Sequence, residues 1–120
     1  MNKTTLVLGA SLKPDRYSNI VINRLRGKDH EVKAFDLKTG EINNVPIDTE
    51  LISYNDINTI SMYLSPQRQK SYYDYIIGLS PKRVIFNPGT ENPELYKILE
   101  ENNIEVEVAC TLVLLATNQY

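Results

Sequence analysis

Residues 4–18, TTLVLGASLKPDRYS, contain an apolar run that stops at one glycine and continues as a polar, basic segment. Thr5–Leu8 lacks regular alternation between polar and apolar residues, which predicts a strand buried on both faces of a sheet. Gly9 can end that strand because glycine adopts backbone dihedrals that other residues rarely reach. Ser18 is a suitable N-cap for a helix that ends at Gly27. The stretch therefore predicts a strand, a connecting loop and a helix.

The rest of the chain alternates between short apolar runs and helical periods. We expect strands at 31–35, 57–64, 83–86 and 105–108, and helices at 66–78, 93–103 and 111–117. Residues 36–56 are polar and irregular, and we expect a loop there with one weak turn or strand. Strands that alternate with helices pair in parallel, because each crossover returns the chain to the same end of the sheet. The pattern predicts a three-layer α/β fold with a doubly wound sheet of about five mainly parallel strands.

The composition of the 120 residues is that of a globular protein, with 42% apolar and 23% charged residues. The net charge is -2 and the basic residues are scattered, so nothing indicates a nucleic-acid binder. No apolar run approaches the ~20 residues needed to cross a bilayer, and the first residues do not read as a signal peptide. Cys110 alone cannot form an internal disulfide. We expect a cytoplasmic protein without membrane association.

The loop after the first strand has the features of an anion site. In doubly wound sheets, ligands bind beyond the carboxyl ends of the strands, where the strand order reverses. Gly9 allows close approach of the backbone to a ligand, and the Ser11 hydroxyl can donate to a phosphate oxygen. The following helix offers free N–H groups at its N-terminus, and Lys13 and Arg16 add formal positive charge. These features predict a phosphate or diphosphate site, with backbone donors at residues 9–11.

The loop differs from the dinucleotide fingerprint G-x-G-x-x-G, because Gly9 is its only glycine. Roughly eight residues separate Gly9 from the predicted helix, and Pro14 stiffens the connection. The helix start is therefore displaced, and a longer pocket opens over the sheet edge. A doubly wound fold without a nucleotide is also compatible with this stretch, in which case Lys13 and Arg16 are simply solvated.

The run GASLKPDRYS, residues 9–18, resembles the opening of the small CoA-binding domain family. Members of this family have a strand, a Gly-(Ala/Val)-Ser turn and a Lys-Pro-x-Arg-x-Ser loop before the first helix. The same domain forms the N-terminal part of the succinyl-CoA synthetase alpha subunit. Residues 87–89, NPG, are similar to a later loop of the family, and 104–113, IEVEVACTLV, to its last strand. The resemblance implies that residues 1–120 form a single Rossmann-like domain that binds coenzyme A.

The resemblance also implies a site made of residues that follow the carboxyl ends of the first four strands. These residues are Gly9, Ala10, Ser11, Lys13, Pro14, Arg16, Ser18, Phe35, Asp36, Tyr63, Leu64, Asn87, Pro88 and Gly89. The diphosphate would lie near the Gly-Ala-Ser turn, and the end of the second strand would face the adenosine.

Two positions depart from the family pattern. Asp36-Leu37 stands where Asn-Pro is frequent, and a carboxylate there repels a 3′-phosphorylated ribose unless Lys38 or another cation compensates. Thr111 follows Cys110, where the family often has proline. Asp36 also fits a dinucleotide site, in which an acidic residue about 20 residues beyond the glycine motif accepts from the ribose 2′-OH.

The sequence shows no catalytic constellation and no metal-ligand spacing. His30 is the only histidine, and it precedes the second predicted strand, far from the first loop. The leading hypothesis is a stand-alone protein that binds coenzyme A or an acyl-CoA as a carrier, sensor or accessory module, and that could form a homo-oligomer. Two alternatives stay open: a small NAD(P)- or nucleotide-binding enzyme or subunit, and a structural or interaction domain that has lost ligand binding.

Overall fold

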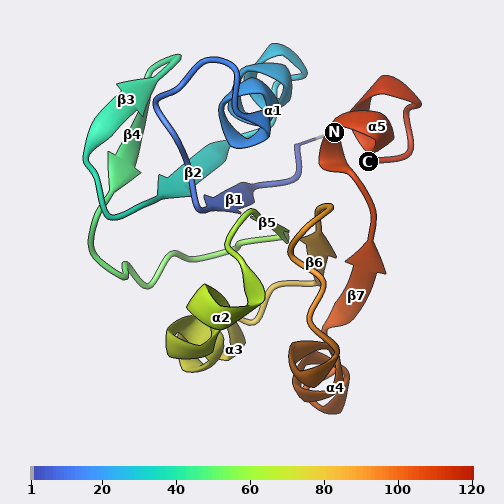
Figure 1. Ribbon diagram of the computed structural model, residues 1–120. Coiled ribbons are helices and arrows are strands. Elements are labelled where there is room, and N and C mark those ends of the chain that lie inside the picture. Colours follow the sequence, from blue (N-terminus) through green and yellow to red (C-terminus); the bar gives the residue numbers. More distant parts are fainter. Residues whose placement is uncertain (1) are drawn as a thin grey trace.

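The computed structural model describes residues 2–120 and has one sheet between two layers of helices (Figure 1). The strands are β1 (Thr5–Leu8), β2 (Val32–Phe35), β3 (Gly40–Ile42), β4 (Val45–Asp48), β5 (Thr59–Met62), β6 (Arg83–Phe86) and β7 (Glu105–Val108). The helices are α1 (Tyr17–Gly27), α2 (Pro66–Gln69), the 3-10 helix η1 (Lys70–Tyr72), α3 (Tyr73–Leu79), α4 (Pro93–Glu101) and α5 (Thr111–Ala116). None of the helices described is long and apolar enough to span a membrane.

The sheet order is β3-β4-β2-β1-β5-β6-β7, and only β3 runs antiparallel to its neighbour. The remaining strands follow the doubly wound order, in which the chain moves outward from β1 first to one side and then to the other. Helices α1 and α5 cover one face, and α2, α3 and α4 cover the other (Figure 1). The expected three-layer, Rossmann-like α/β class is confirmed.

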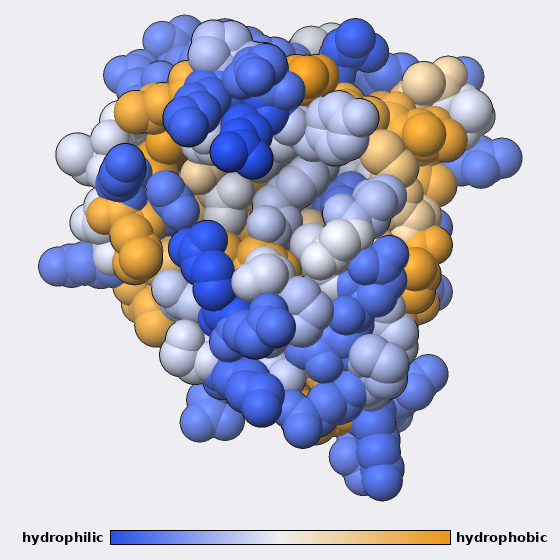
Figure 2. All heavy atoms as spheres, viewed as in Figure 1, coloured by the Kyte–Doolittle hydropathy of each residue, from blue (hydrophilic) through white to orange (hydrophobic). Residues whose placement is uncertain are grey.

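The first strand is buried on both faces, as its continuous apolar run predicts. Leu6 and Leu8 belong to the core cluster on the face of α3 and α4, and Val7 belongs to the cluster under α1. All four residues of β1 are fully buried. In a space-filling view, hydrophobic residues gather at two sides of the molecule, one near α5 and β7 and the other near β3 and β4 (Figure 2).

The segment expected to be mostly loop contains two strands, so the sheet has seven strands rather than about five. Asn43 and Asn44 connect β3 to β4 with positive φ angles of 48° and 66°, the conformation of a two-residue hairpin turn that asparagine tolerates. Val45 and Ile47 of β4 are buried, and β4 pairs in parallel with β2. The sequence did not predict this hairpin, because β3 (GEI) and β4 (VPID) contain few apolar residues and include Gly40 and Pro46, which are uncommon inside strands.

The helix expected over 66–78 is divided into α2, η1 and α3. Gln69, at the end of α2, is fully buried, and its Nε2 donates to the carbonyl oxygens of Leu64 and Thr90, each at 2.8 Å. Its Oε1 accepts from Asn92 Nδ2 at 2.9 Å. These bonds hold α2 against the ends of β5 and of β6, and a 3-10 turn then redirects the chain into α3.

A second buried amide fastens the carboxyl edge of the sheet. Asn87 follows β6, and its Nδ2 donates to Ser61 Oγ at 3.0 Å and to the Met62 carbonyl at 2.9 Å. Its Oδ1 accepts from the backbone N–H of Thr111 at 2.8 Å. One side chain thus joins the ends of β5 and β6 to the start of α5.

The turn that leaves β1 depends on a glycine. Gly9 has a φ of +101°, and an added Cβ would lie 3.1 Å from the backbone carbon of Tyr63 and 3.1 Å from Leu64 Cδ2. Both the dihedral and the contact exclude a larger residue without a shift of the backbone. The first loop therefore passes directly over the end of β5.

We expect Gly9→Val to lower the free energy of unfolding by about 2–4 kcal/mol, through the strained dihedral and the contact with β5. Gly27→Ala, in the last turn of α1, is the control, since a Cβ there meets nothing within 4 Å. Urea unfolding of both variants checks this. Equal stability of the two variants would show that the turn tolerates a side chain.

We expect Asn87→Ala to lower the free energy of unfolding by about 2–4 kcal/mol, because the buried Thr111 N–H and Met62 carbonyl lose their partner. Asn55→Ala, at an exposed position in the crossover from β4 to β5, removes the same amide and should change stability little. Thermal and urea unfolding of the two variants measure the difference. A loss below about 1 kcal/mol for Asn87→Ala would mean that water replaces the amide.

Candidate functional site

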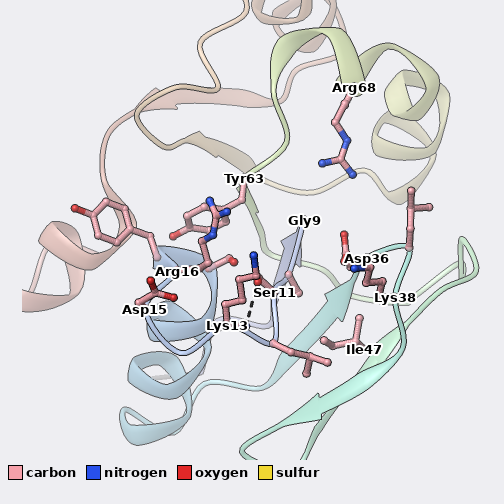
Figure 3. Close-up of a pocket in the computed structure, with 15 residues that line it drawn as sticks. Gly9, Ser11, Lys13, Asp15, Arg16, Asp36, Lys38, Ile47, Tyr63 and Arg68 are labelled. Carbon is pink, nitrogen blue, oxygen red and sulfur yellow. Dashed lines mark hydrogen bonds between the residues drawn. The ribbon is translucent and has the colours of Figure 1, made fainter.

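A cavity of about 820 Å³ opens at the carboxyl ends of β1, β2 and β5, the point at which the strand order reverses. Its walls come from the first loop, the start of α1, the segment after β2, and residues of β4 and α2 (Figure 3). The lining residues are Gly9, Ala10, Ser11, Leu12, Lys13, Asp15, Arg16, Tyr17, Ser18, Asp36, Leu37, Lys38, Ile47, Tyr63 and Arg68.

Many of the residues predicted from the sequence meet in this cavity. They are Gly9, Ala10, Ser11, Lys13, Arg16, Ser18, Asp36 and Tyr63. Three separate segments of the chain contribute them, and these segments converge because β2 and β5 flank β1 in parallel register.

The structure does not bring the other predicted residues to the cavity. Phe35 and Leu64 are 3% and 1% exposed, and their side chains belong to the core cluster on the face of α3 and α4. Asn87 is committed to its buried hydrogen bonds. The exposed residues Pro14 and 88–89 are also absent from the lining.

Several residues of the lining were not predicted from the sequence. They are Leu12, Asp15, Tyr17, Leu37, Ile47 and Arg68, while Lys38 entered only as a compensating charge. Leu37 follows Asp36 directly and could have been included as its neighbour. Ile47 and Arg68 lie in β4 and α2, and only the order of the strands places these elements beside the first loop.

The backbone donors expected at residues 9–11 need a correction. The N–H groups of Gly9 and Ala10 both donate to the Phe35 carbonyl, at 3.0 and 2.9 Å, and so extend the pairing of β1 with β2. These two groups are therefore not free for a ligand. Within residues 2–120, the N–H groups of Ser11 and Leu12 have no protein acceptor. Of the three expected donors only Ser11 is therefore free, and Leu12 adds a second free donor.

The N-terminus of α1 adds further free donors. The helix begins at Tyr17, and its N-cap Arg16 provides no side-chain cap. Ser18, expected as the cap, lies inside the first turn and is only 5% exposed. The Arg16 carbonyl accepts from Asn19 and Ile20, which leaves the N–H groups of Tyr17 and Ser18 without an intrahelical acceptor at the cavity. An uncapped helix end of this kind favours an anion.

Internal hydrogen bonds shape the first loop before any ligand arrives. Asn19 Nδ2 donates to the Ser11 carbonyl at 2.9 Å, and Arg16 N–H donates to the Lys13 carbonyl at 3.1 Å. Ser11 Oγ accepts from the Lys13 N–H at 3.2 Å. Because this hydroxyl acts as an acceptor within the loop, its own hydrogen is available to a ligand.

The cavity is more basic than the chain as a whole. Its cationic side chains are Lys13, Arg16, Lys38 and Arg68. Its carboxylates are Asp15 and Asp36. In the described part of the chain, the ion pairs are Lys33–Glu31 and Arg83–Glu107, so none of the cavity cations is neutralised by a paired carboxylate. An acidic protein of net charge -2 thus presents an excess of positive charge at this edge.

One part of the lining is apolar or uncharged. Leu12 and Leu37 are 47% and 67% exposed, and Ile47 of β4 is a further apolar residue of the lining. The side chain of Leu12 packs against the backbone of Gly40. A Cβ on Gly40 would lie only 2.6 Å from Leu12 Cδ2, so a larger residue there would displace the Leu12 side chain. Burial raises the pKa of Tyr63 to about 12, so its hydroxyl is uncharged at neutral pH. These surfaces can accommodate a planar base.

Comparison with solved structures shows the same fold in proteins of different size. A crystal structure described only as an uncharacterized protein is 43% identical, has a TM-score of 0.98, and is matched over 100% of this chain and 99% of its own. A protein of Thermus thermophilus is 24% identical, with a TM-score of 0.86, over 99% of this chain and 91% of its own. An acetyl-coenzyme A synthetase from Ca. Korarchaeum cryptofilum is 17% identical, with a TM-score of 0.67, over 87% of this chain and 25% of its own.

No protein with a curated description matches the chain in sequence. The sequence profile of the CoA binding domain does match, and the match extends over residues 3–116. It therefore includes the first loop, both flanking strands and α2, which are the elements that form the basic cavity. The chain belongs to the CoA binding domain family.

Proposed function

We propose that residues 1–120 act as a single domain that binds coenzyme A or an acyl-CoA in the cavity at the carboxyl end of β1. The observation that carries this proposal is the basic cavity beside an uncapped helix N-terminus, in a chain of the CoA binding domain family. Its volume of about 820 Å³ lies within the range of about 300–1,000 Å³ of small-molecule sites.

In the proposed complex, the diphosphate lies at the first loop. The N–H groups of Ser11 and Leu12 and those at the start of α1 donate hydrogen bonds to it. Lys13 and Arg16 supply positive charge. The adenosine lies toward Asp36 and the exposed leucines. The Asp36 carboxylate is then placed to accept from the ribose 2′-OH.

We further propose that the protein is a carrier, sensor or accessory module rather than an enzyme. The cavity lining combines four cations with free N–H groups, which suits the binding of an anion, and among the described residues it contains no histidine or cysteine. Its carboxylates are Asp15 and Asp36, of which Asp36 is assigned to the ribose, and the Tyr63 hydroxyl, with its pKa of about 12, is no base at neutral pH. The uncharacterized protein of 43% identity supports a stand-alone role, because the match with this chain extends over 99% of its length. In the acetyl-coenzyme A synthetase the fold spans 25% of the chain.

A dinucleotide-binding function is the second candidate, and Asp36 favours it. This carboxylate lines the cavity at the end of β2, where dinucleotide folds hold the ribose of NAD. The longer, single-glycine loop favours CoA, because the helix begins at Tyr17, eight residues after Gly9. A direct comparison of the two ligands separates these functions.

We expect CoA to bind with measurable heat and to raise the midpoint of thermal unfolding, while NAD at the same concentration does much less. Isothermal calorimetry and a thermal-shift titration on the intact chain provide both readouts. Absence of heat and of any shift at millimolar CoA, with the protein folded by circular dichroism, would refute the proposed function. Stronger stabilisation by NAD would favour the dinucleotide alternative.

We expect Arg16→Glu to weaken CoA binding at least about 100-fold, because a charge-assisted contact is lost and a repulsive charge faces the diphosphate. Stability should change little, since Arg16 is exposed and a carboxylate is favourable at a helix N-terminus. Arg24→Glu, exposed in the last turn of the same helix, makes the same change in net charge away from the cavity. If both variants bind CoA equally well, Arg16 does not contact the ligand.

A further inference from the structure

We propose that Arg68, acting with Lys38, forms a subsite for the 3′-phosphate of the adenosine and gives the cavity a preference for 3′-phosphorylated adenine nucleotides. This inference rests on the proposed CoA function and names the residue that sets its specificity. Arg68 belongs to α2 and lies outside the first loop, which holds the diphosphate in the proposed complex.

Arg68 enters the cavity from the side opposite to the first loop. Figure 3 shows its side chain extending from α2 toward the centre of the cavity, on the side where Asp36 and Lys38 lie. Lys13 and Arg16 stand at the other end, with the loop and α1. The cations therefore form two groups at two ends of one cavity.

The backbone of Arg68 is held in place before a ligand binds. Its N–H donates to the Ser65 carbonyl at 3.0 Å. The next residue, Gln69, is fully buried and bonded to the Leu64 and Thr90 carbonyls. Only the exposed side chain of Arg68 must be ordered on binding, which lowers the entropic cost of using it.

The positive charges of Arg68 and Lys38 are not paired with carboxylates in the described part of the chain. In residues 2–120, neither side chain has a carboxylate oxygen within 4.0 Å. Asp36, on the same side of the cavity, would repel a phosphate on its own. The two cations outnumber this carboxylate and supply the compensation that a phosphate beside it requires.

Two separated cationic groups correspond to the two separated anions of CoA. Its diphosphate and its 3′-phosphate lie on either side of the ribose, whereas NAD and dephospho-CoA carry only the diphosphate. The planar guanidinium of Arg68 can bind a phosphate through two parallel N–H bonds, and Lys38 adds a point charge. Asp36 then accepts from the adjacent 2′-OH, so each ribose substituent meets a complementary group.

The test compares CoA with dephospho-CoA, which differs only by the 3′-phosphate, in calorimetric titrations of the wild-type chain and of Arg68→Gln. We expect the wild type to bind CoA about 10- to 100-fold more tightly than dephospho-CoA, the range for a charged hydrogen-bonded contact. Arg68→Gln should lose most of this preference, with dephospho-CoA binding unchanged within about twofold. Arg26→Gln, exposed in the last turn of α1, removes the same charge elsewhere and should retain the preference.

The remaining outcomes each decide a different point. If the wild type binds both ligands equally, or if Arg68→Gln weakens both by the same factor, the 3′-phosphate subsite is refuted while CoA binding stands. If the wild type binds neither ligand while folded, the proposed function falls and the subsite falls with it. Unfolding midpoints of all variants without ligand confirm that the affinities are compared between folded proteins.

Discussion

The structure depends on one close approach, in which the backbone of Gly9 passes over the end of β5 with a φ of +101°. This turn allows the N–H groups of Gly9 and Ala10 to donate to the Phe35 carbonyl and so to extend the pairing of β1 with β2. The chain is then free to form a long loop before α1 begins. A side chain at position 9 would press on Tyr63 and Leu64 at the end of β5 and would displace this turn at the edge of the cavity.

Two buried amides keep the surrounding edge in place. Asn87 joins β5, β6 and α5, and Gln69 joins α2 to the loop that follows β6. Each satisfies backbone groups that would otherwise be buried without partners, which makes such side chains effective fasteners of loops. Gln69 thereby fixes the backbone next to Arg68, and the exposed cations of the cavity remain available to an anion.

The position of the first loop and the general fold were predictable because they depend on residues that are close together in the sequence. The apolar run of Thr5–Leu8, its glycine stop and the basic segment that follows are contiguous, and alternating strands and helices allow few sheet arrangements. The β3–β4 hairpin was missed because its strands contain few apolar residues and include Gly40 and Pro46, which the sequence pattern associates with a loop. Two of the three expected backbone donors, those of Gly9 and Ala10, were predicted wrongly, since their bonds to the Phe35 carbonyl involve a partner distant in sequence.

The strand–loop–helix unit, the α/β class and the basic character of the opening loop could be predicted from the sequence, because these features follow from neighbouring residues. Which other segments complete the cavity depends on how the strands are ordered in the sheet. Arg68 and Ile47 reach it because parallel pairing sets β5 beside β1 and β4 beside β2, whereas Phe35 and Leu64 turn into the core. Successive side chains of a strand point to opposite faces of the sheet, and strands pair over long separations in the sequence. The order of the strands and the face to which each side chain points therefore decide which residues reach a site at the sheet edge.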